Sequence, residues 1–154
     1  KVLLAPELGA LRSSLFQDRL TLLDLDKPAA ISDILRVHDY NYIAKISSSC
    51  ESLKSLATAD SQSLNKRLDV DTVLTAESYD AAVNAAGCVI EAIRDVVEGK
   101  GRNALCVVRP AGHHAGPLGA SEALVEAGSK TRSHGFCLLS NVAIGAAHAM
   151  ANRL

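Results

Sequence analysis

A short apolar run followed by two adjacent histidines constrains this chain most. Residues 104–108, Ala-Leu-Cys-Val-Val, form a continuous apolar segment that ends in β-branched residues. Such a run is typical of a strand buried on both faces, as in a parallel sheet. Pro110 ends the run because proline cannot donate to a sheet ladder, and Gly112 lets the backbone turn before His113 and His114. The segment predicts a site, because ligands of open α/β sheets bind beyond the carboxyl ends of strands.

His113 and His114 are candidates for proton transfer or metal ligation. Histidine has the unperturbed pKa closest to working pH, so it suits both tasks. Neighbouring side chains of a strand point to opposite faces, whereas in a glycine-flanked loop both rings can reach one cleft. A solvated or structurally satisfied pair is the alternative, and the surrounding features leave the two interpretations evenly balanced.

The remaining pattern predicts an α/β fold in one domain. Residues 75–98 carry an apolar stripe at helical spacing, with Thr75 as the expected cap and Gly99 as the expected left-handed stop. This helix leads directly into the apolar run, which is half of a β-α-β unit and implies a parallel sheet. Residues 19–25 predict a further strand, and residues 141–153 predict a helix capped by Ser140.

Two polar stretches predict irregular surface structure. Residues 47–71 are rich in serine and predict a mobile loop with one helical turn. Residues 117–134 form a polar insert between the histidine pair and the next motif. The insert is interpreted as a tolerated surface loop, with a lid or partner-selecting role as the alternative. His38 is predicted to be structural, with its ring satisfied by local hydrogen bonds.

Three motifs together resemble the zinc-dependent histone deacetylase family, most closely its class II branch. Arg-Pro-Ala-Gly-His-His-Ala at 109–115 is followed by Gly-Phe-Cys at 135–137 and by Asn-Val-Ala at 141–143. Residues 37–43 and Asp71-Thr72 also look like segments of that family. The resemblance implies an open parallel sheet with helices on both faces, as in arginase-like and deacetylase folds.

The activity that the resemblance implies is removal of acetyl groups from lysine side chains of histones or other proteins. His114 is then expected to be the general base and His113 its electrostatic partner. Gly135 would place a carbonyl near the lysine nitrogen, and Phe136 would form an apolar wall of the lysine tunnel. Asp71 is expected at the pocket rim, binding the substrate backbone, with Asp69 or a merely solvated carboxylate as alternatives.

Zinc is the cofactor that the resemblance implies, but neither histidine is a family ligand. The family binds zinc through Asp-x-His and a further aspartate, and these motifs do not occur in residues 1–154. The chain is therefore expected to be a partial deacetylase domain, inactive alone, with an apolar strand edge exposed at residues 104–108. Deacetylation of acetylpolyamines or other small molecules is an alternative, and a non-catalytic interaction module that lost its metal is another.

Composition restricts the partners and the location. The chain of 154 residues is 48% hydrophobic and has a formal net charge of −1, so it has no basic field for direct nucleic-acid binding. No apolar run is long enough for a membrane span. Four cysteines without metal-type spacing indicate free thiols of a reducing compartment. The resemblance adds co-repressor proteins as partners and the nucleus or cytoplasm as location.

Overall fold

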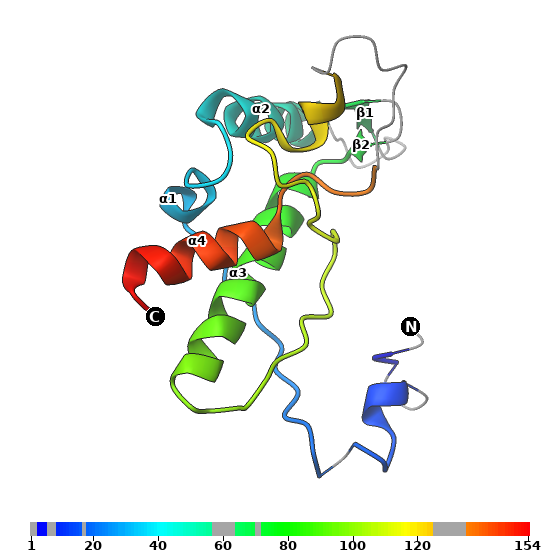
Figure 1. Ribbon diagram of the computed structural model, residues 1–154. Helices are drawn as coiled ribbons and strands as arrows, with labels where there is room; N and C mark the ends of the chain where they lie inside the picture. Colours follow the sequence, from blue (N-terminus) through cyan, green and yellow to red (C-terminus); the bar gives the residue numbers. More distant parts are fainter. Residues whose placement is uncertain (1–2, 6–8, 17, 57–63, 70–71, 125–134) are drawn as a thin grey trace.

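Four α-helices, two short 3-10 helices and a two-stranded sheet make up the described part of the chain. The computed structural model describes residues 3–5, 9–16, 18–56, 64–69, 72–124 and 135–154 (Figure 1). The elements in chain order are η1 (Ala10–Arg12), α1 (Ile31–Ile34), α2 (Tyr40–Leu56), β1 (Lys66–Arg67), β2 (Val73–Leu74), α3 (Ser78–Val97), η2 (Gly119–Leu124) and α4 (Asn141–Asn152). No helix among the described residues is both long and apolar enough to cross a membrane.

Helix α3 is the central element, and α4 crosses it at close range (Figure 1). A Cβ added at Gly145 of α4 would lie 2.8 Å from both Val89 and Ile93 of α3, so the small residue permits this approach. Helix α4 is capped as predicted, since the Ser140 hydroxyl accepts from the Ala143 N–H at 3.3 Å.

The predicted cap of α3 is wrong, although the helix and its stop are confirmed. The helix begins at Ser78 and not at Thr75, and its N-cap position is Glu77. The Thr75 hydroxyl is engaged with the Glu77 carboxylate at 3.2 Å, so it does not cap a backbone N–H. Gly99 has φ of 75°, the left-handed conformation expected of a residue that ends a helix.

The predicted mobile loop at 47–71 is wrong over its first ten positions, because α2 continues to Leu56. Ile46, Cys50 and Leu53 are buried on one face of α2, and this stripe stabilises the helix through tertiary packing. Ser48, Ser52 and Ser55 lie on the exposed face, where Ser52 Oγ donates to the Ser48 carbonyl at 2.8 Å, whereas Ser49 is buried. Positions 57–63 and 70–71 lie outside the described residues.

The predicted strand at 104–108 does not form, and its predicted burial is wrong. Leu105 is 73% exposed and Val107 is 42% exposed. A strand needs a hydrogen-bonded neighbour, and the sheet found in the described ranges consists of β1 paired antiparallel with β2. The strand predicted at 19–25 is likewise not formed, because residues 20–30 are extended but belong to no sheet. The fold is therefore α/β, but the open parallel sheet is not present among the described residues.

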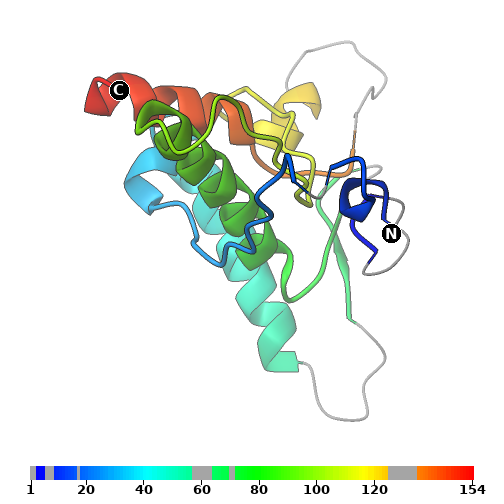
Figure 2. The same cartoon turned by 90° about the horizontal axis from the view of Figure 1, so that it is seen from below.

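Both extended segments run along α3. The Ala29 N–H donates to the Val83 carbonyl at 2.9 Å, and a Cβ at Gly87 would lie 1.8 Å from the Lys27 carbonyl oxygen. On the other segment, the Cys106 thiol donates to the Cys88 carbonyl at 3.8 Å. Figure 2 shows the segment before α1 passing beside α3. Glycine at 87 is required because any side chain would displace the backbone of the neighbouring segment.

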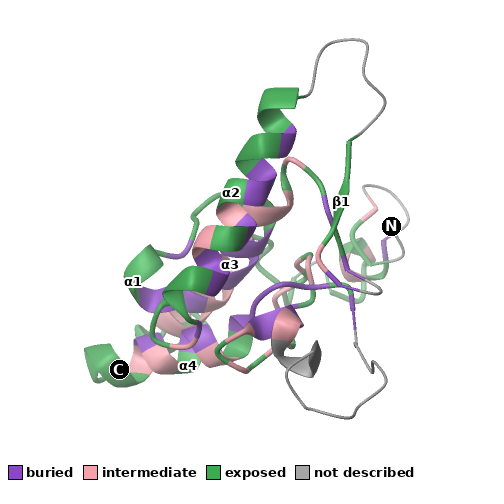
Figure 3. Cartoon of the chain, turned by 90° about the horizontal axis from the view of Figure 1, so that it is seen from above, coloured by how far each residue is buried: buried purple, intermediate pink, exposed green. Residues whose placement is uncertain are grey.

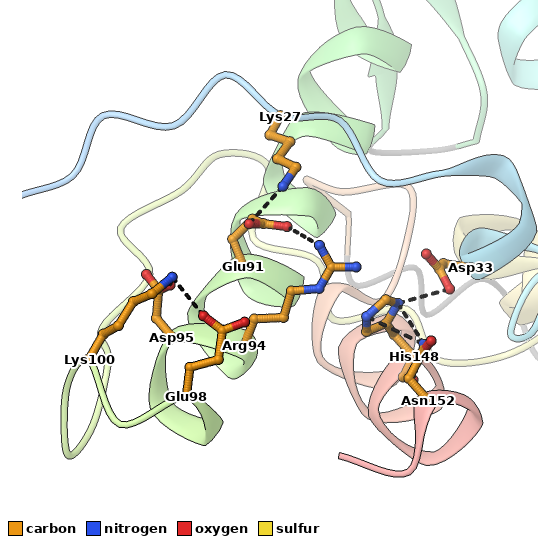
Figure 4. A network of polar contacts seen from close by, with 9 residues as sticks. All are labelled: Lys27, Asp33, Glu91, Arg94, Asp95, Glu98, Lys100, His148 and Asn152. Carbon is orange, nitrogen blue, oxygen red and sulfur yellow. Dashed lines mark hydrogen bonds and ion pairs between the residues drawn. The ribbon is translucent and has the colours of Figure 1, made fainter.

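The core lies between α2, α3 and α4, as the buried faces in Figure 3 show. Its most completely buried side chains include Ile34, Ile46, Leu74 and Ile144. A network of polar contacts on α3 and α4 supplements this core (Figure 4). In it, Glu91 pairs with Lys27 and Arg94, each at 2.8 Å, while buried His148 of α4 contacts Asp33 of α1 at 3.0 Å. The core and this network together hold α3 and α4 in place, and the two motif segments lie in the chain between these helices.

Candidate active site

The segment at 109–116 and the segment at 135–140, called the first and second motif segments, lie side by side just before the start of α4. The Asn141 N–H donates to the Gly112 carbonyl at 3.0 Å, and the His114 N–H donates to the Leu139 carbonyl at 3.2 Å. His113 and Ser140 form an antiparallel bridge between these bonds. Segments separated by about two dozen residues are thus joined backbone to backbone, which fixes the histidine pair relative to Gly135, Phe136 and Cys137.

Gly112 is required by its neighbour and by its backbone. Its φ is 75°, and a Cβ there would lie 2.2 Å from the Asn141 side chain. Asn141 Nδ2 in turn donates to the Pro110 carbonyl at 3.3 Å. The first residue of α4 therefore holds the turn that leads into the histidines.

The histidine rings lie next to each other, as the loop interpretation predicted. Their ring centroids are 4.5 Å apart and their planes are inclined by 43°. His113 is exposed, His114 is half-buried, and Cys137 beneath them is buried. The His113 N–H donates to Cys137 Sγ at 3.2 Å, so the thiol also helps to position the pair. The arrangement presents one solvated and one partly desolvated imidazole to the same region.

The His38 ring binds both motif segments through hydrogen bonds. Its Nδ1 lies 3.0 Å from the Gly116 carbonyl oxygen, and its Nε2 accepts from the Ser140 N–H at 3.0 Å. This pairing requires the neutral tautomer with the proton on Nδ1. The structural role predicted for His38 is confirmed, but the predicted local partners are wrong, because both lie far away in the sequence.

Tyr42 is a second support that the sequence did not reveal as more than a core residue. Its hydroxyl donates to the Leu138 carbonyl at 2.7 Å and accepts from the Ala120 N–H at 2.9 Å. Burial is the main cause that raises the pKa of Tyr42 far above its ordinary value. The hydroxyl therefore stays protonated and ties the insert to the second motif. Nothing in the local sequence signals such long-range partners.

A pocket of about 370 Å³ adjoins the motifs. It lies between the start of α3, the segment at 72–73 and both motifs, and its lining residues are Thr72, Val73, Ser78, Ala81, Arg109, Pro110, Phe136, Cys137 and Leu138. The histidines themselves are not part of this lining, so Cys137 is the residue that links the pocket to the pair. Phe136 is 71% exposed, so it lies at the outer edge of the pocket and not in the core, and its φ of 69° places its backbone in the left-handed region.

Of the two carboxylates predicted at the pocket rim, Asp69 is placed by the structure. Asp71 lies outside the described residues. Its alternative, Asp69, is buried, and its Oδ1 accepts from the Thr72 N–H at 2.7 Å. Asp69 therefore binds the backbone of Thr72, just before β2. Gly135 is buried and Phe136 lines the pocket; the substrate contacts predicted for both stay predictions.

Within the described residues, one group of three histidine, cysteine or carboxylate donors could share a metal ion. It consists of His113, His114 and Cys137, whose donor atoms all lie within 4.8 Å of one another. This nitrogen and sulfur set differs from the aspartate-and-histidine set that the resemblance implies for zinc. The described residues therefore do not account for the family's zinc ion, and the chemistry that they support by themselves is proton transfer.

Comparisons with known proteins agree with the motifs. The model of the histone deacetylase domain matches residues 8–154. Type-2 histone deacetylase 2 of Dictyostelium discoideum is 35% identical over 132 residues, covering 75% of this chain and 7% of that protein. Histone deacetylase HDA1 of Saccharomyces cerevisiae is 35% identical over 131 residues, covering 82% of this chain and 15% of that protein. The histone deacetylase-like amidohydrolase of Pseudomonas aeruginosa is 32% identical over 117 residues, with 76% and 24% covered.

A solved structure shares the fold. The crystal structure of the HD domain of HDA15 aligns with a TM-score of 0.69 at 24% identity, covering 92% of this chain and 34% of that chain. The chain thus spans about a third of that domain and a smaller share of the curated relatives. The matched residues include the histidine pair, the Gly-Phe-Cys segment and the start of α4, and on this evidence the chain belongs to the histone deacetylase family.

Proposed function

We propose that this chain carries the histidine-pair side of an active site that hydrolyses the amide of acetylated lysine in histones or other proteins. The observation that carries the proposal is the placement of His113 and His114, whose rings lie 4.5 Å apart beside Cys137 and the exposed Phe136. A general base must be held within hydrogen-bond reach of its proton. Bonds from Leu139, Ser140 and Cys137 to the pair's backbone supply that rigidity.

His114 is the better general base because it is half-buried, whereas His113 is exposed. In this proposal His114 takes the proton of the attacking water and returns it to the departing lysine amine. His113 stabilises the charge that develops on the neighbouring ring. Partial exclusion of water strengthens both interactions, because electrostatic forces are weaker in bulk water.

The substrate side is assigned to the second motif. Phe136 provides an apolar wall for the lysine methylenes, and covering its ring on substrate binding contributes about 2 kcal/mol. The carbonyl of Gly135 accepts from the lysine nitrogen, and position 71 contacts the substrate backbone. Zinc belongs to the proposal as the family's cofactor, with ligands other than His113 and His114. Co-repressor partners and a nuclear or cytoplasmic location are part of the same proposal.

The histidine roles are tested by kinetics on the full protein with an acetyl-lysine peptide. His114→Ala is expected to lower kcat by about 10²-fold to 10⁴-fold, the usual contribution of a positioned acid-base group. His113→Ala is expected to have a smaller effect. Met150→Ala, at an exposed position of α4 remote from the pair, is the control and should keep wild-type kcat.

Circular dichroism would verify that each variant folds. Unchanged kcat in folded His114→Ala protein would remove the general base from the proposal. A wild-type protein with no turnover on peptide or acetylpolyamine would favour the alternative of a non-catalytic module.

A further inference from the structure

We propose that His113, His114 and Cys137 together form a binding site for a borderline transition-metal ion such as Zn²⁺ or Co²⁺. Two imidazole nitrogens and one thiolate are the donors that these ions prefer in proteins. The three residues come from both motif segments, and the structure brings them together although 22 residues lie between His114 and Cys137. Three protein donors with one open position match a four-coordinate site that keeps a water ligand.

The donor spacing is close to what an ion needs. The donor atoms all lie within 4.8 Å of one another. An ion at the centre of three atoms at that upper limit would lie about 2.8 Å from each, against about 2.0–2.3 Å for zinc bound by nitrogen and sulfur. Closing the difference requires the sulfur to move by about 0.5 Å and each nitrogen by about 0.8 Å, and rotations of the two imidazoles and the thiol are the expected source of these shifts.

The backbone around the donors is already fixed in place. The His114 N–H is bonded to the Leu139 carbonyl at 3.2 Å, and His113 bridges Ser140. The His113 N–H donates to Cys137 Sγ at 3.2 Å, a contact that holds the sulfur beside the histidine pair. Because the chain has already lost its freedom here, ion binding pays little ordering entropy.

The site is open on one side. Burial increases from exposed His113 through half-buried His114 to buried Cys137. An ion can therefore enter past His113 and reach a sulfur that bulk solvent does not. An entry path and a dry floor are both expected of a specific metal site.

Occupation of the site has a consequence that depends on the proposed function. A nitrogen lone pair that ligates a metal cannot accept a proton, so the ion would block the general base. The proposed site therefore makes this chain sensitive to reversible inhibition by excess Zn²⁺, and removing Cys137 should weaken that sensitivity.

The direct test is a titration of the metal-free full protein with Co²⁺ under reducing, oxygen-free conditions. A thiolate ligand gives cobalt an intense near-ultraviolet charge-transfer band, which nitrogen and oxygen ligands do not. We expect this band in the wild-type protein and its loss in Cys137→Ser. Cys50→Ser is the matched control, because Cys50 is equally buried but lies on α2, and it should keep the band.

A second variant protects the test against misfolding. His113→Gln changes an exposed side chain and should weaken Co²⁺ binding by about 10-fold or more, since even indirect supports of a metal site contribute 10-fold to 100-fold. Absence of the band in folded wild-type protein would overturn the site, as would a band that persists in Cys137→Ser. The band is independent of turnover, so a protein without deacetylase activity could still show it, and the two proposals can fail separately.

Discussion

Single buried residues hold the candidate site together by bonding partners from distant segments. His38 is 2% exposed and joins the Gly116 carbonyl to the Ser140 N–H, one from each motif segment. Tyr42, one turn into α2, joins Leu138 to Ala120 in the same way. These two buried rings therefore hold the segments that position the histidine pair.

Replacing His38 should therefore destabilise the protein strongly. His38→Ala leaves the partly buried Gly116 carbonyl and the buried Ser140 N–H without their ring partner, and the loss of a buried bond costs about 1–3 kcal/mol. We expect the free energy of unfolding to fall by about 2–4 kcal/mol in urea denaturation. Tyr40→Ala, at a 65% exposed position nearby, serves as the control. Equal changes in the free energy of unfolding for the two substitutions would show that the His38 ring does not stabilise the fold.

At the scale of elements, α2 shows how packing overrides composition. A serine-rich sequence has weak helix propensity, because hydroxyls compete for backbone bonds. Here Ser48, Ser52 and Ser55 donate to carbonyls of the preceding turn at 2.8–3.2 Å, and the helix persists because its other face is buried. The exposed serines are therefore tolerated by the helix and do not stabilise it.

Alanine at these serines should strengthen α2. The combined substitution of Ser48, Ser52 and Ser55 by alanine is expected to raise the free energy of unfolding by about 1 kcal/mol, from propensity alone. Ser52→Pro should instead lower it by about 3 kcal/mol, because proline clashes with the carbonyl of Ser48. Thermal or urea unfolding followed by circular dichroism measures both. If both variants unfolded like the wild type, the segment would behave as a loop after all.

At the scale of the whole molecule, the extended segments beside α3 carry exposed apolar side chains. Leu105 and Val107 are exposed on one segment, and Leu22 and Leu23, at 45% and 59% exposure, on the other. Unpaired backbone with apolar side chains can pair with another chain. This surface distinguishes the chain from a domain whose sheet is covered on both faces.

Self-association through residues 104–108 is the expected consequence for this chain in solution. Sedimentation velocity at micromolar concentration should show species larger than the monomer, and the double substitution Leu105→Glu and Val107→Glu should shift them toward the monomer. Leu15→Glu removes a 77% exposed leucine elsewhere and should leave the distribution unchanged. A wild-type chain that sediments purely as a monomer would contradict the prediction.

The sequence by itself determined the local features that depend on neighbouring residues. The apolar period of residues 78–97, the left-handed stop at Gly99 and the cap at Ser140 follow from short-range sterics and hydrogen bonding, and all three are present. The motif around His113 and His114 likewise identified the family, since its residue types and spacing are specific.

Only the tertiary structure decided what depends on distant partners. The serine-rich stretch predicts a loop, but it forms α2 because one of its faces is buried. Residues 104–108 predict a strand, but among the described residues no neighbouring strand pairs with them. The roles of His38 and Tyr42, and the approach of Cys137 to the histidine pair, join positions far apart in the chain. Local propensity carries no information on such contacts, because their energy exists only once the segments have met.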